Sequence, residues 1–363
     1  MHDLKLLKPR PKLQAGPNAY HGAIDFEELA AFGLQAEDVI DFSVNSNPFG
    51  AVAEVAEALQ SVAISRYPDK ACIRLRQALS QQLDLPMDNI LVGNGSAELL
   101  WLIAFAYIGK ADKVLVLGPT FAEYRRNAQL MSAEVYEWRA DAESDFALDE
   151  ATIEQMLIEL NPAVFHLCSP NNPTGSQISN QTLQRWSRMS PETLFVVDEA
   201  YAQFLPDYVS AMHAGLMNVL VLRSMTKDYA LAGIRLGYVT GPVELISVLE
   251  RVKVPWSVNE FAQAAGVAAI AAQSKYAAMW LDLQAEAIAF KAELKQLGYR
   301  PAESPMHYFL MEVGDGRRWR QHLLKHGLLV RLCDSYDLTS HVRLSTQLPD
   351  QNRRLLAMLQ NLQ

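Results

Sequence analysis

Residues 219–238 read VLVLRSMTKDYALAGIRLGY, an apolar run of strand character that ends in Ser224, Thr226 and Lys227. A second cation, Arg235, follows among small residues. An amine at the mouth of a buried strand loses its water, and the nearby arginines repel its charged form. Its pKa therefore falls, and the neutral amine is a nucleophile toward carbonyls. The stretch predicts a lysine that forms a Schiff base with an aldehyde.

Two other interpretations of Lys227 are open at this point. A lysine just after a strand is commonly an exposed loop residue. Ser224 and Lys227 also match the Ser-x-x-Lys pattern of serine acyl enzymes, but the companion Ser-Asp-Asn and Lys-Thr-Gly motifs are absent from the sequence. The rest of the chain has to decide between them.

Length and composition describe an ordinary globular protein. With 363 residues, half of them hydrophobic, the chain suits one large domain with a smaller one attached. The formal net charge of −9, without an extended basic run, argues against nucleic acid or a membrane surface as a partner. Cys72, Cys168 and Cys333 are widely spaced, which indicates neither a disulfide framework nor a metal site and fits a reducing cytoplasm. Residues 1–12 lack the apolar core of a secretory signal, and the longest apolar run, 99–108, is too short to cross a bilayer.

Strand and helix signals alternate through the middle of the chain. Apolar strands separated by helices imply a mostly parallel sheet that is covered by helices on both faces. The predicted strands are 90–92, 114–117, 163–168, 194–197 and 219–222, and the predicted helices are 121–131, 149–160 and 182–189.

The composition and the predicted secondary structure change along the chain and indicate three parts. Residues 1–45 carry proline and glycine breakers and form an irregular arm that also contributes to a small domain. Residues 46–245 form the large domain. Residues 246–363 form a smaller α+β domain, with strands at 307–313, 328–333 and 341–344 and helices that include 319–326 and 350–362, and a helix at 243–252 leads into it.

A glycine-bearing turn, Gly93-Asn94-Gly95-Ser96, joins the strand at 90–92 to an apolar helix. Its small residues let backbone N–H groups approach a phosphate, and the helix N-terminus adds partial positive charge. Position 98 is Glu, so the Gly-x-Gly-x-x-Gly pattern fails, and no Gly-Lys-Ser/Thr follows. The turn predicts a phosphate seat without a nucleotide signature.

Polar residues collect where the other strands end, which is where ligands bind in parallel sheets. Asp198 directly follows an apolar strand, and a buried carboxylate needs a cationic or protonated partner. The alternative is an aspartate that caps the next helix. Arg331 and Arg343 end short apolar strands, either as surface residues with buried stems or as forks for a carboxylate or phosphate.

These parts together describe one site that holds an amine, a phosphate seat, a buried carboxylate, an asparagine, a tyrosine and several arginines. Pyridoxal phosphate has the matching aldehyde, phosphate, pyridinium and phenolate. The sequence therefore predicts pyridoxal phosphate as the cofactor and no metal.

Here the chain resembles the fold type I pyridoxal-phosphate aminotransferases (class I/II) across nearly its whole length. The resemblance rests on the motifs at 47–50 (NPFG), 93–96 (GNGS), 171–175 (NNPTG), 198–201 (DEAY), 224–227 (SMTK) and 233–238 (GIRLGY). It implies an α/β fold with a mostly parallel, seven-stranded sheet between helices in the large domain, plus a smaller α+β domain. Within the family the chain resembles the branch of histidinol-phosphate aminotransferase and, more closely, of threonine-phosphate decarboxylase. The closer likeness rests on the motifs at 21–22 (HG), 66–69 (RYPD), 121–124 (FAEY), 255–259 (PWSVN) and 330–336 (VRLCDSY).

The resemblance also implies residue roles toward the cofactor. Lys227 would hold it covalently and later transfer a proton, while Asp198 would pair with the pyridinium nitrogen. Asn172 and Tyr201 would bond its phenolic oxygen, and Lys227, Asp198 and Tyr201 form the catalytic set. Its phosphate would be bound by Gly95, Ser96, Ala97, Ser224, Thr226 and Arg235.

Further implied roles concern the ring face, the neighbouring subunit and the substrate. Tyr124 would stack on the cofactor ring, with Phe121 as a substitute. Tyr67 would reach the phosphate of the neighbouring subunit, so the active unit would be a homodimer. Arg343 would take the carboxylate of a small phosphorylated amino acid. Its distal phosphate would be bound by residues drawn from Arg331, Asn47 and His21.

The reaction expected from the resemblance is decarboxylation of L-threonine O-3-phosphate to aminopropanol phosphate, a lyase step of cobalamin synthesis. The alternative is a histidinol-phosphate aminotransferase-like transfer of an amino group to 2-oxoglutarate. The same residues serve both, because the reaction depends on which bond of the substrate stands perpendicular to the cofactor ring. A third hypothesis, a cofactor-binding regulator, would need a DNA-binding module, for which we expect no room at either terminus. Ala23 stands where the decarboxylases usually carry a second glycine after His-Gly.

Overall fold

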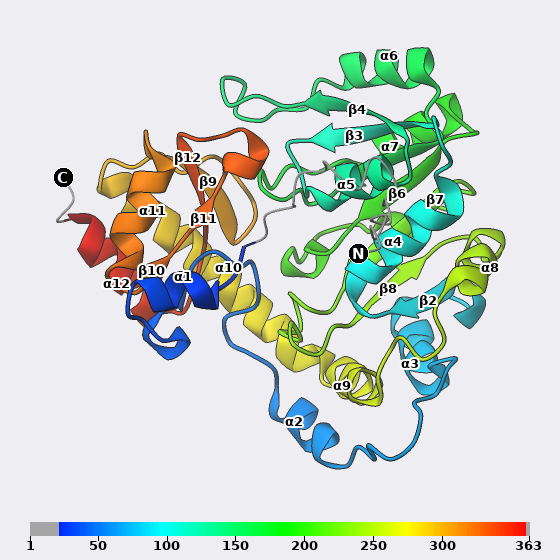
Figure 1. The fold of residues 1–363 in the computed structure, drawn as a ribbon, viewed down its shortest axis with the longest axis horizontal. Coiled ribbons are helices and arrows are strands. Elements are labelled where there is room, and N and C mark those ends of the chain that lie inside the picture. Colours follow the sequence, from blue (N-terminus) through cyan, green and yellow to red (C-terminus); the bar gives the residue numbers. More distant parts are fainter. Residues whose placement is uncertain (1–21, 361–363) are drawn as a thin grey trace, which may run out of the picture.

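The computed structural model describes residues 22–360, and a seven-stranded sheet forms the centre of its larger part (Figure 1). Strand β8 runs antiparallel to both of its neighbours, while β7, β6, β5, β3 and β4 are parallel. The predicted mostly parallel sheet of seven strands is thus confirmed. In spatial order the strands are β2 (Ile90–Gly93), β8 (Gly237–Thr240), β7 (Val219–Ser224), β6 (Leu194–Asp198), β5 (Val164–Cys168), β3 (Lys113–Gly118) and β4 (Glu134–Arg139).

Helices cover both faces of this sheet because most of its strands are apolar on both sides. One face packs against α4 (Gly95–Tyr107), α5 (Glu123–Leu130) and α8 (Val243–Val252). The other face packs against α6 (Glu150–Leu160) and α7 (Asn180–Met189). Core side chains such as Leu99 and Leu157 are fully buried, and each contributes about 1.5–3 kcal/mol through its removal from water.

Two strands of the sheet were not predicted from the sequence, and each has a physical reason. Strand β4 lies at the sheet edge, where half-buried residues replace the continuous apolar run of a central strand. Strand β8 has only four residues and begins at Gly237. A Cβ at Gly237 would lie 2.6 Å from the backbone nitrogen of Ser96 and 2.8 Å from the carbonyl oxygen of Arg223. Glycine therefore lets β8 pass directly beside the turn at the start of α4.

The smaller part of the molecule is built on an antiparallel sheet in the order β11-β12-β9. The single strand predicted at 328–333 is instead two short strands that pair with different partners. The first, β10, pairs in parallel with β1, and the second, β11, pairs with β12. The elements are α1 (Phe26–Ala31), β1 (Ile40–Asp41), β9 (Tyr308–Glu312), α11 (Gly316–Leu324), β10 (Leu328–Leu329), β11 (Arg331–Leu332), β12 (His341–Ser345) and α12 (Pro349–Gln360).

A third group of helices lies below the large sheet in Figure 1, and α10 runs from it to the small sheet. These helices are α2 (Ala53–Gln60), α3 (Ile73–Leu83), α9 (Glu260–Ala271) and α10 (Gln273–Gln296). Helix α9 packs against α2 and α3, and α8 packs on the large sheet. The predicted domain boundary at residue 245 stays a prediction, and this packing favours one further along the chain, inside α10.

No helix among the described residues has the length and apolarity that a bilayer crossing requires. Short 3-10 helices occupy several of the connections between the longer elements. The 3-10 helices are η2 (Ala36–Asp38), η3 (Met87–Asn89), η4 (Ala202–Phe204), η5 (Ala211–His213) and η6 (Asp334–Tyr336).

Candidate active site

A cavity of about 440 Å³ lies where β5, β6 and β7 end, between the large sheet and the arginines of the small sheet. The carboxyl ends of parallel strands are the usual place for a ligand in an open α/β sheet. Most of the residues predicted from the sequence line this cavity. They are Ser96, Ala97, Tyr124, Asn172, Asp198, Tyr201, Ser224, Thr226, Lys227, Arg235, Arg331 and Arg343.

Lys227 follows the last residues of β7 and presents its amine to the cavity. Its carbonyl oxygen accepts a hydrogen bond of 2.9 Å from the backbone N–H of Asn47. The pKa of the amine is lowered to about 8, mainly by burial and also by the positive charges of Arg343 and Arg235. Both causes are those expected from the sequence. A buried amine of this kind does not fit the alternative of an exposed loop lysine.

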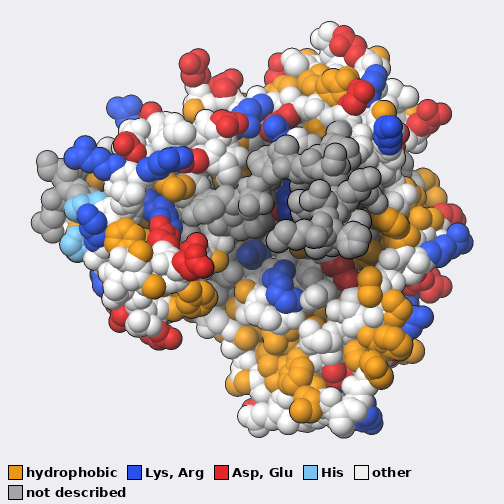
Figure 2. Space-filling model, viewed as in Figure 1, with side chains coloured by type: hydrophobic (Ala, Val, Ile, Leu, Met, Phe, Trp, Pro, Cys, Tyr) orange, Lys and Arg blue, Asp and Glu red, His pale blue; other side chains and the backbone are white. Residues whose placement is uncertain are grey.

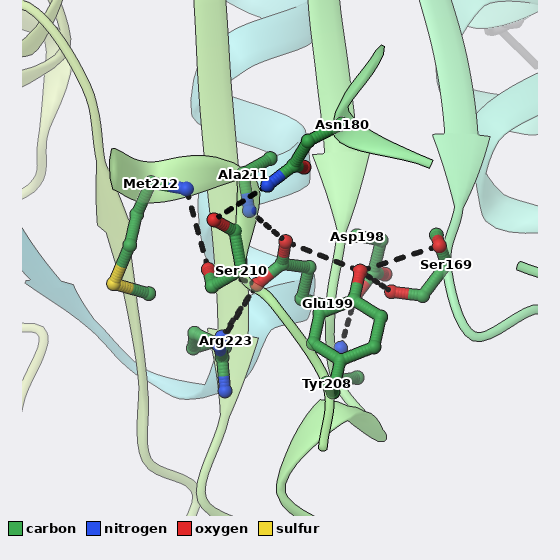
Figure 3. Close-up of polar contacts among 10 residues, drawn as sticks. Ser169, Asn180, Asp198, Glu199, Tyr208, Ser210, Ala211, Met212 and Arg223 are labelled. Carbon is green, nitrogen blue, oxygen red and sulfur yellow. Dashed lines mark hydrogen bonds and ion pairs between the residues drawn. The ribbon is translucent and has the colours of Figure 1, made fainter. Parts of the chain in front are cut away.

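Two adjacent carboxylates at the end of β6 have opposite environments. Glu199 is 1% exposed and accepts hydrogen bonds from the Arg223 guanidinium at 2.9 Å and from the Ser210 hydroxyl at 2.5 Å (Figure 3). Asp198 faces the cavity. Its donors within residues 22–360 are both neutral, namely the Tyr124 hydroxyl at 2.7 Å and the Ala200 N–H at 3.0 Å.

The pKa of Asp198 is raised to about 6, mainly because burial disfavours the charged carboxylate. A buried carboxylate without a cation is costly, so the position fits a ligand that brings a positive charge. The ring nitrogen of pyridoxal phosphate, when protonated, is such a charge. The alternative that Asp198 only caps a helix leaves this burial unexplained.

The turn before α4 has the geometry of an anion seat. Gly95 has a φ of +76°, a conformation that glycine adopts without strain. A Cβ there would lie 2.8 Å from Nη2 of Arg235, so the guanidinium lies directly against the turn. The hydroxyls of Ser224 and Thr226, 2.6 Å apart, line the same cavity. Backbone amides at a helix start, two hydroxyls and a guanidinium are suited to a phosphate.

Tyr124 has a different environment from the one expected. Its ring is stacked on that of His166, with 5.3 Å between the ring centroids and 4° between the ring planes. Its hydroxyl donates a hydrogen bond to Asp198. Phe121 also lines the cavity and meets Tyr124 edge-on at 5.6 Å. Stacking of either ring on a cofactor stays a prediction, and the contacts of Tyr124 favour Phe121 for that role.

Arg331 and Arg343 are direct cross-strand partners on β11 and β12. They are 3% and 4% exposed, so the interpretation as surface residues is wrong. Both line the cavity, so an anionic ligand there would meet two guanidinium groups. Arg343 donates hydrogen bonds to the amide oxygen of Asn172 and to the Ser43 carbonyl. Arg331 donates to the Ser335 hydroxyl at 3.0 Å.

The sequence prediction named Asn47, but of the two asparagines after β1 it is Asn45 that lines the cavity. Asn45 is 2% exposed, and within residues 22–360 its amide nitrogen and oxygen have no hydrogen-bond partner. The side chain of Asn47 instead binds the backbone of Asp228 and Phe49. Side chains two apart share a face only in a regular strand, and the chain bends here after β1, so spacing alone could not choose between them.

Two other predicted positions lie outside the cavity or the described residues. Tyr67 does not line the cavity of its own chain; it is 81% exposed and its ring lies 4.8 Å from that of Trp256. His21 lies outside the described residues. Its neighbour Gly22 lines the cavity, and a Cβ there would lie 2.6 Å from the Ser43 carbonyl oxygen.

Taken together, the residues present fit pyridoxal phosphate. They provide a buried amine of lowered pKa, a carboxylate whose donors are neutral, an anion seat and two polar groups, Asn172 and Tyr201, beside them. The serine acyl enzyme alternative gains no support, since the Ser224 hydroxyl is bonded to Thr226.

Comparison with known proteins gives consistent matches over most of the chain. Residues 37–359 match the family model described as aminotransferase class I and II. The chain is 35% identical over 336 residues to a histidinol-phosphate aminotransferase of Symbiobacterium thermophilum, covering 90% of this chain and 91% of the relative. It is 32% identical over 355 residues to the threonine-phosphate decarboxylase of Salmonella typhimurium, covering 95% and 96%.

The fold has close counterparts among solved structures. Histidinol-phosphate aminotransferase from Sinorhizobium meliloti, solved in complex with pyridoxal-5'-phosphate, superposes with a TM-score of 0.87 at 22% identity and covers 97% of this chain and 96% of that one. The predicted sheet and its flanking helices are therefore those of a known fold.

Proposed function

The chain belongs to the class I and II aminotransferase family and is a pyridoxal-phosphate-dependent enzyme, and from this premise we propose that it transfers an amino group from a small phosphorylated amine, of the histidinol-phosphate kind, to a 2-oxo acid. The observation that carries the proposal is the pairing of Arg331 with Arg343 at one cavity with Lys227. One guanidinium suits a phosphate and the other a carboxylate. These are the anionic groups of the amine and of a 2-oxo acid such as 2-oxoglutarate.

Lys227 and Asp198 carry the chemistry in this proposal. When bound, pyridoxal phosphate supplies an electron sink for the bond broken at the α carbon of the substrate. Lys227 would hold the cofactor, and its Nζ, once the substrate amine has displaced it, would take the α proton, for which a pKa of about 8 is well matched near neutral pH. Asp198 keeps the cofactor ring nitrogen protonated, while Asn172 and Tyr201 bond the phenolic oxygen.

The substrate is recognised through its anionic ends. Arg343 takes the carboxylate of the 2-oxo acid, and its Nε is buried without a partner in residues 22–360. Arg331 takes the phosphate of the amine, together with Asn45, which lines the cavity and whose amide has no partner among residues 22–360. A buried amide left without a partner costs about 1–3 kcal/mol, so a bound phosphate would relieve that cost.

Decarboxylation of L-threonine O-3-phosphate, the reaction first expected from the sequence, is the second candidate. The relatives favour the aminotransferase, since histidinol-phosphate aminotransferases from several organisms match the chain. The similarity to a threonine-phosphate decarboxylase nevertheless spans 95% of the chain. Ala23 also has a φ of +125°, which favours glycine, so the backbone has the conformation that a second glycine would adopt.

One assay separates the two reactions. Cofactor-loaded protein is incubated with histidinol phosphate and 2-oxoglutarate, and separately with L-threonine O-3-phosphate alone. The proposal expects glutamate that appears only when both substrates of the first reaction are present. Carbon dioxide released from threonine phosphate without 2-oxoglutarate, and no glutamate in the first reaction, would replace it with the second candidate. Histidinol without its phosphate is the matched control and should react far more slowly.

We also keep a homodimer as part of the proposal. Apolar side chains gather over the region of α2 and α9 (Figure 2). Tyr67 and Trp256, whose ring centroids lie 4.8 Å apart, are also exposed. A partner subunit at this surface would bury them and bring Tyr67 to the second cavity. Mixing inactive Tyr67→Ala and Lys227→Ala chains tests this, because a shared site predicts that mixed dimers regain activity while a self-contained site predicts none. The three free, buried cysteines accord with a reducing cytoplasm.

A further inference from the structure

The Tyr124 hydroxyl, rather than its ring, is the part of this residue that the cavity uses. The hydroxyl donates to Oδ2 of Asp198 at 2.7 Å, while Oδ1 accepts from the backbone N–H of Ala200 at 3.0 Å. One donor on each carboxylate oxygen fixes the plane of the group. Each oxygen keeps a further lone pair, so the carboxylate can still accept from a ligand in the cavity.

The packing around Tyr124 holds that hydroxyl in place. The residue lies in the first turn of α5 and is 1% exposed. Its ring is nearly coplanar with that of His166 on β5, which burial keeps neutral by lowering its pKa to about 3. The tyrosine is therefore packed between a central strand and its own helix. Its hydroxyl cannot move away from Asp198 without disrupting the stacking on His166.

From this geometry we propose that Tyr124 is a positioning residue, whose hydroxyl keeps Asp198 ionised and oriented toward the ring nitrogen of the cofactor; the inference rests on the proposed role of Asp198. A hydroxyl that donates to a carboxylate stabilises its charged form. Without that donor, the desolvated carboxylate keeps a single neutral partner and binds a proton more readily. Its ion pair with the cofactor nitrogen is then weaker.

The contrast with Glu199 supports this function. Glu199 is ion-paired with Arg223 and accepts a hydrogen bond from the Ala211 N–H, so its partners lie within the described protein. The positive charge that would pair with Asp198 comes from a ligand. Until that ligand binds, a neutral hydrogen-bond donor has to keep the carboxylate ionised. Tyr124 is the side chain that does so.

The test uses the full chain freed of its cofactor and two probes: pyridoxal phosphate, and its analogue with carbon in place of the ring nitrogen. Tyr124→Phe removes only the hydroxyl and keeps the ring. Tyr107→Phe is the matched control, because it removes a tyrosine hydroxyl that donates at 3.0 Å to the Leu245 carbonyl. Dissociation constants are measured for both probes with each variant and with Asp198→Asn.

Tyr124→Phe should weaken binding of pyridoxal phosphate about 10- to 150-fold, the range for one hydrogen bond to a charged group, and leave the carbon analogue nearly unchanged. Equal weakening of both probes would mean that the hydroxyl only supports packing, and no weakening of either would mean that it does nothing; each overturns the inference. Asp198→Asn should erase the preference for pyridoxal phosphate over the analogue. If that preference survives, it is the proposed role of Asp198 that fails.

Discussion

Arg343 of β12 donates a hydrogen bond to the side-chain oxygen of Asn172, in the loop after β5. This bond joins the small sheet to the loop that is predicted to bond the phenolic oxygen of the cofactor. In the proposed function, the residue that binds the substrate carboxylate thus contacts a residue that binds the cofactor. A change at Arg343 should be felt on both sides of the cavity.

Arg343→Gln should lower kcat/KM for the carboxylate-bearing substrate by about 30-fold or more, since truncating one partner of a buried, hydrogen-bonded charge pair costs about 2–5 kcal/mol. Initial rates at varied 2-oxoglutarate measure the effect. Arg353→Gln is the control, because Arg353 is an exposed arginine of α12 paired with Asp350, and it should keep wild-type values. Unchanged kcat/KM in Arg343→Gln would remove the arginine from the substrate site.

The rate at which the cofactor-free protein binds pyridoxal phosphate should rise with pH, and the midpoint of this rise should lie near pH 8. The pKa of Lys227 is lowered from 10.5 to about 8, so the neutral, nucleophilic amine predominates above that pH. Arg343→Gln removes a positive charge that disfavours the ammonium, so the pKa of Lys227 and the midpoint should move to higher pH. Stopped-flow absorbance over a pH series measures both. A midpoint that stays fixed or falls in the variant contradicts the charge effect.

Gly237→Ala should weaken cofactor binding by at least about tenfold, because a misplacement of the phosphate seat by a few tenths of an ångström loses hydrogen bonds worth about 1.5–3 kcal/mol to a charged group. The added Cβ would meet the Ser96 nitrogen at 2.6 Å. Gly233→Ala is the matched control, since a Cβ there meets nothing within 4 Å. Equilibrium titration with pyridoxal phosphate compares the two, and equal affinities would show that β8 does not hold the seat.

Glu199→Gln should destabilise the fold by about 3–5 kcal/mol, because it leaves the Arg223 guanidinium buried without its counter-charge (Figure 3). Urea unfolding measures the change in free energy. Glu303→Gln, which breaks the exposed pair with Lys295, should cost less than about 1 kcal/mol. A loss at Glu199 as small as that of the control would mean that the network is not a main support of the large sheet.

The alternation of apolar strands with helices was enough to predict the parallel sheet, because central strands are buried on both faces and read as unbroken apolar runs. Strands β4 and β8 lack that signal, one through its edge position and the other through its length. The predicted strand at 328–333 was divided because Leu328 and Arg331 pair with strands from opposite ends of the chain. Pairing between strands that are far apart in the chain gives no signal in the local sequence.

The residues around the cavity were predictable where a polar group directly ends an apolar strand, as for Lys227 and Asp198. They were not predictable where a local bend or a helix start decides which side chain faces inward. Helix α5 begins at Glu123, two residues later than predicted, so Phe121 belongs to the turn before it and Tyr124 to its first turn. Spacing in the sequence could not show which of these two rings contacts Asp198.

The central claim is that Lys227 holds pyridoxal phosphate covalently. Reduction of the cofactor-loaded protein with borohydride, followed by peptide mass spectrometry, tests it most directly. We predict one pyridoxyl phosphate group per chain, on the peptide that contains Lys227, and none at that level in Lys227→Ala. Labelling of a different lysine in the wild-type protein, or equal labelling of the variant, would contradict the account.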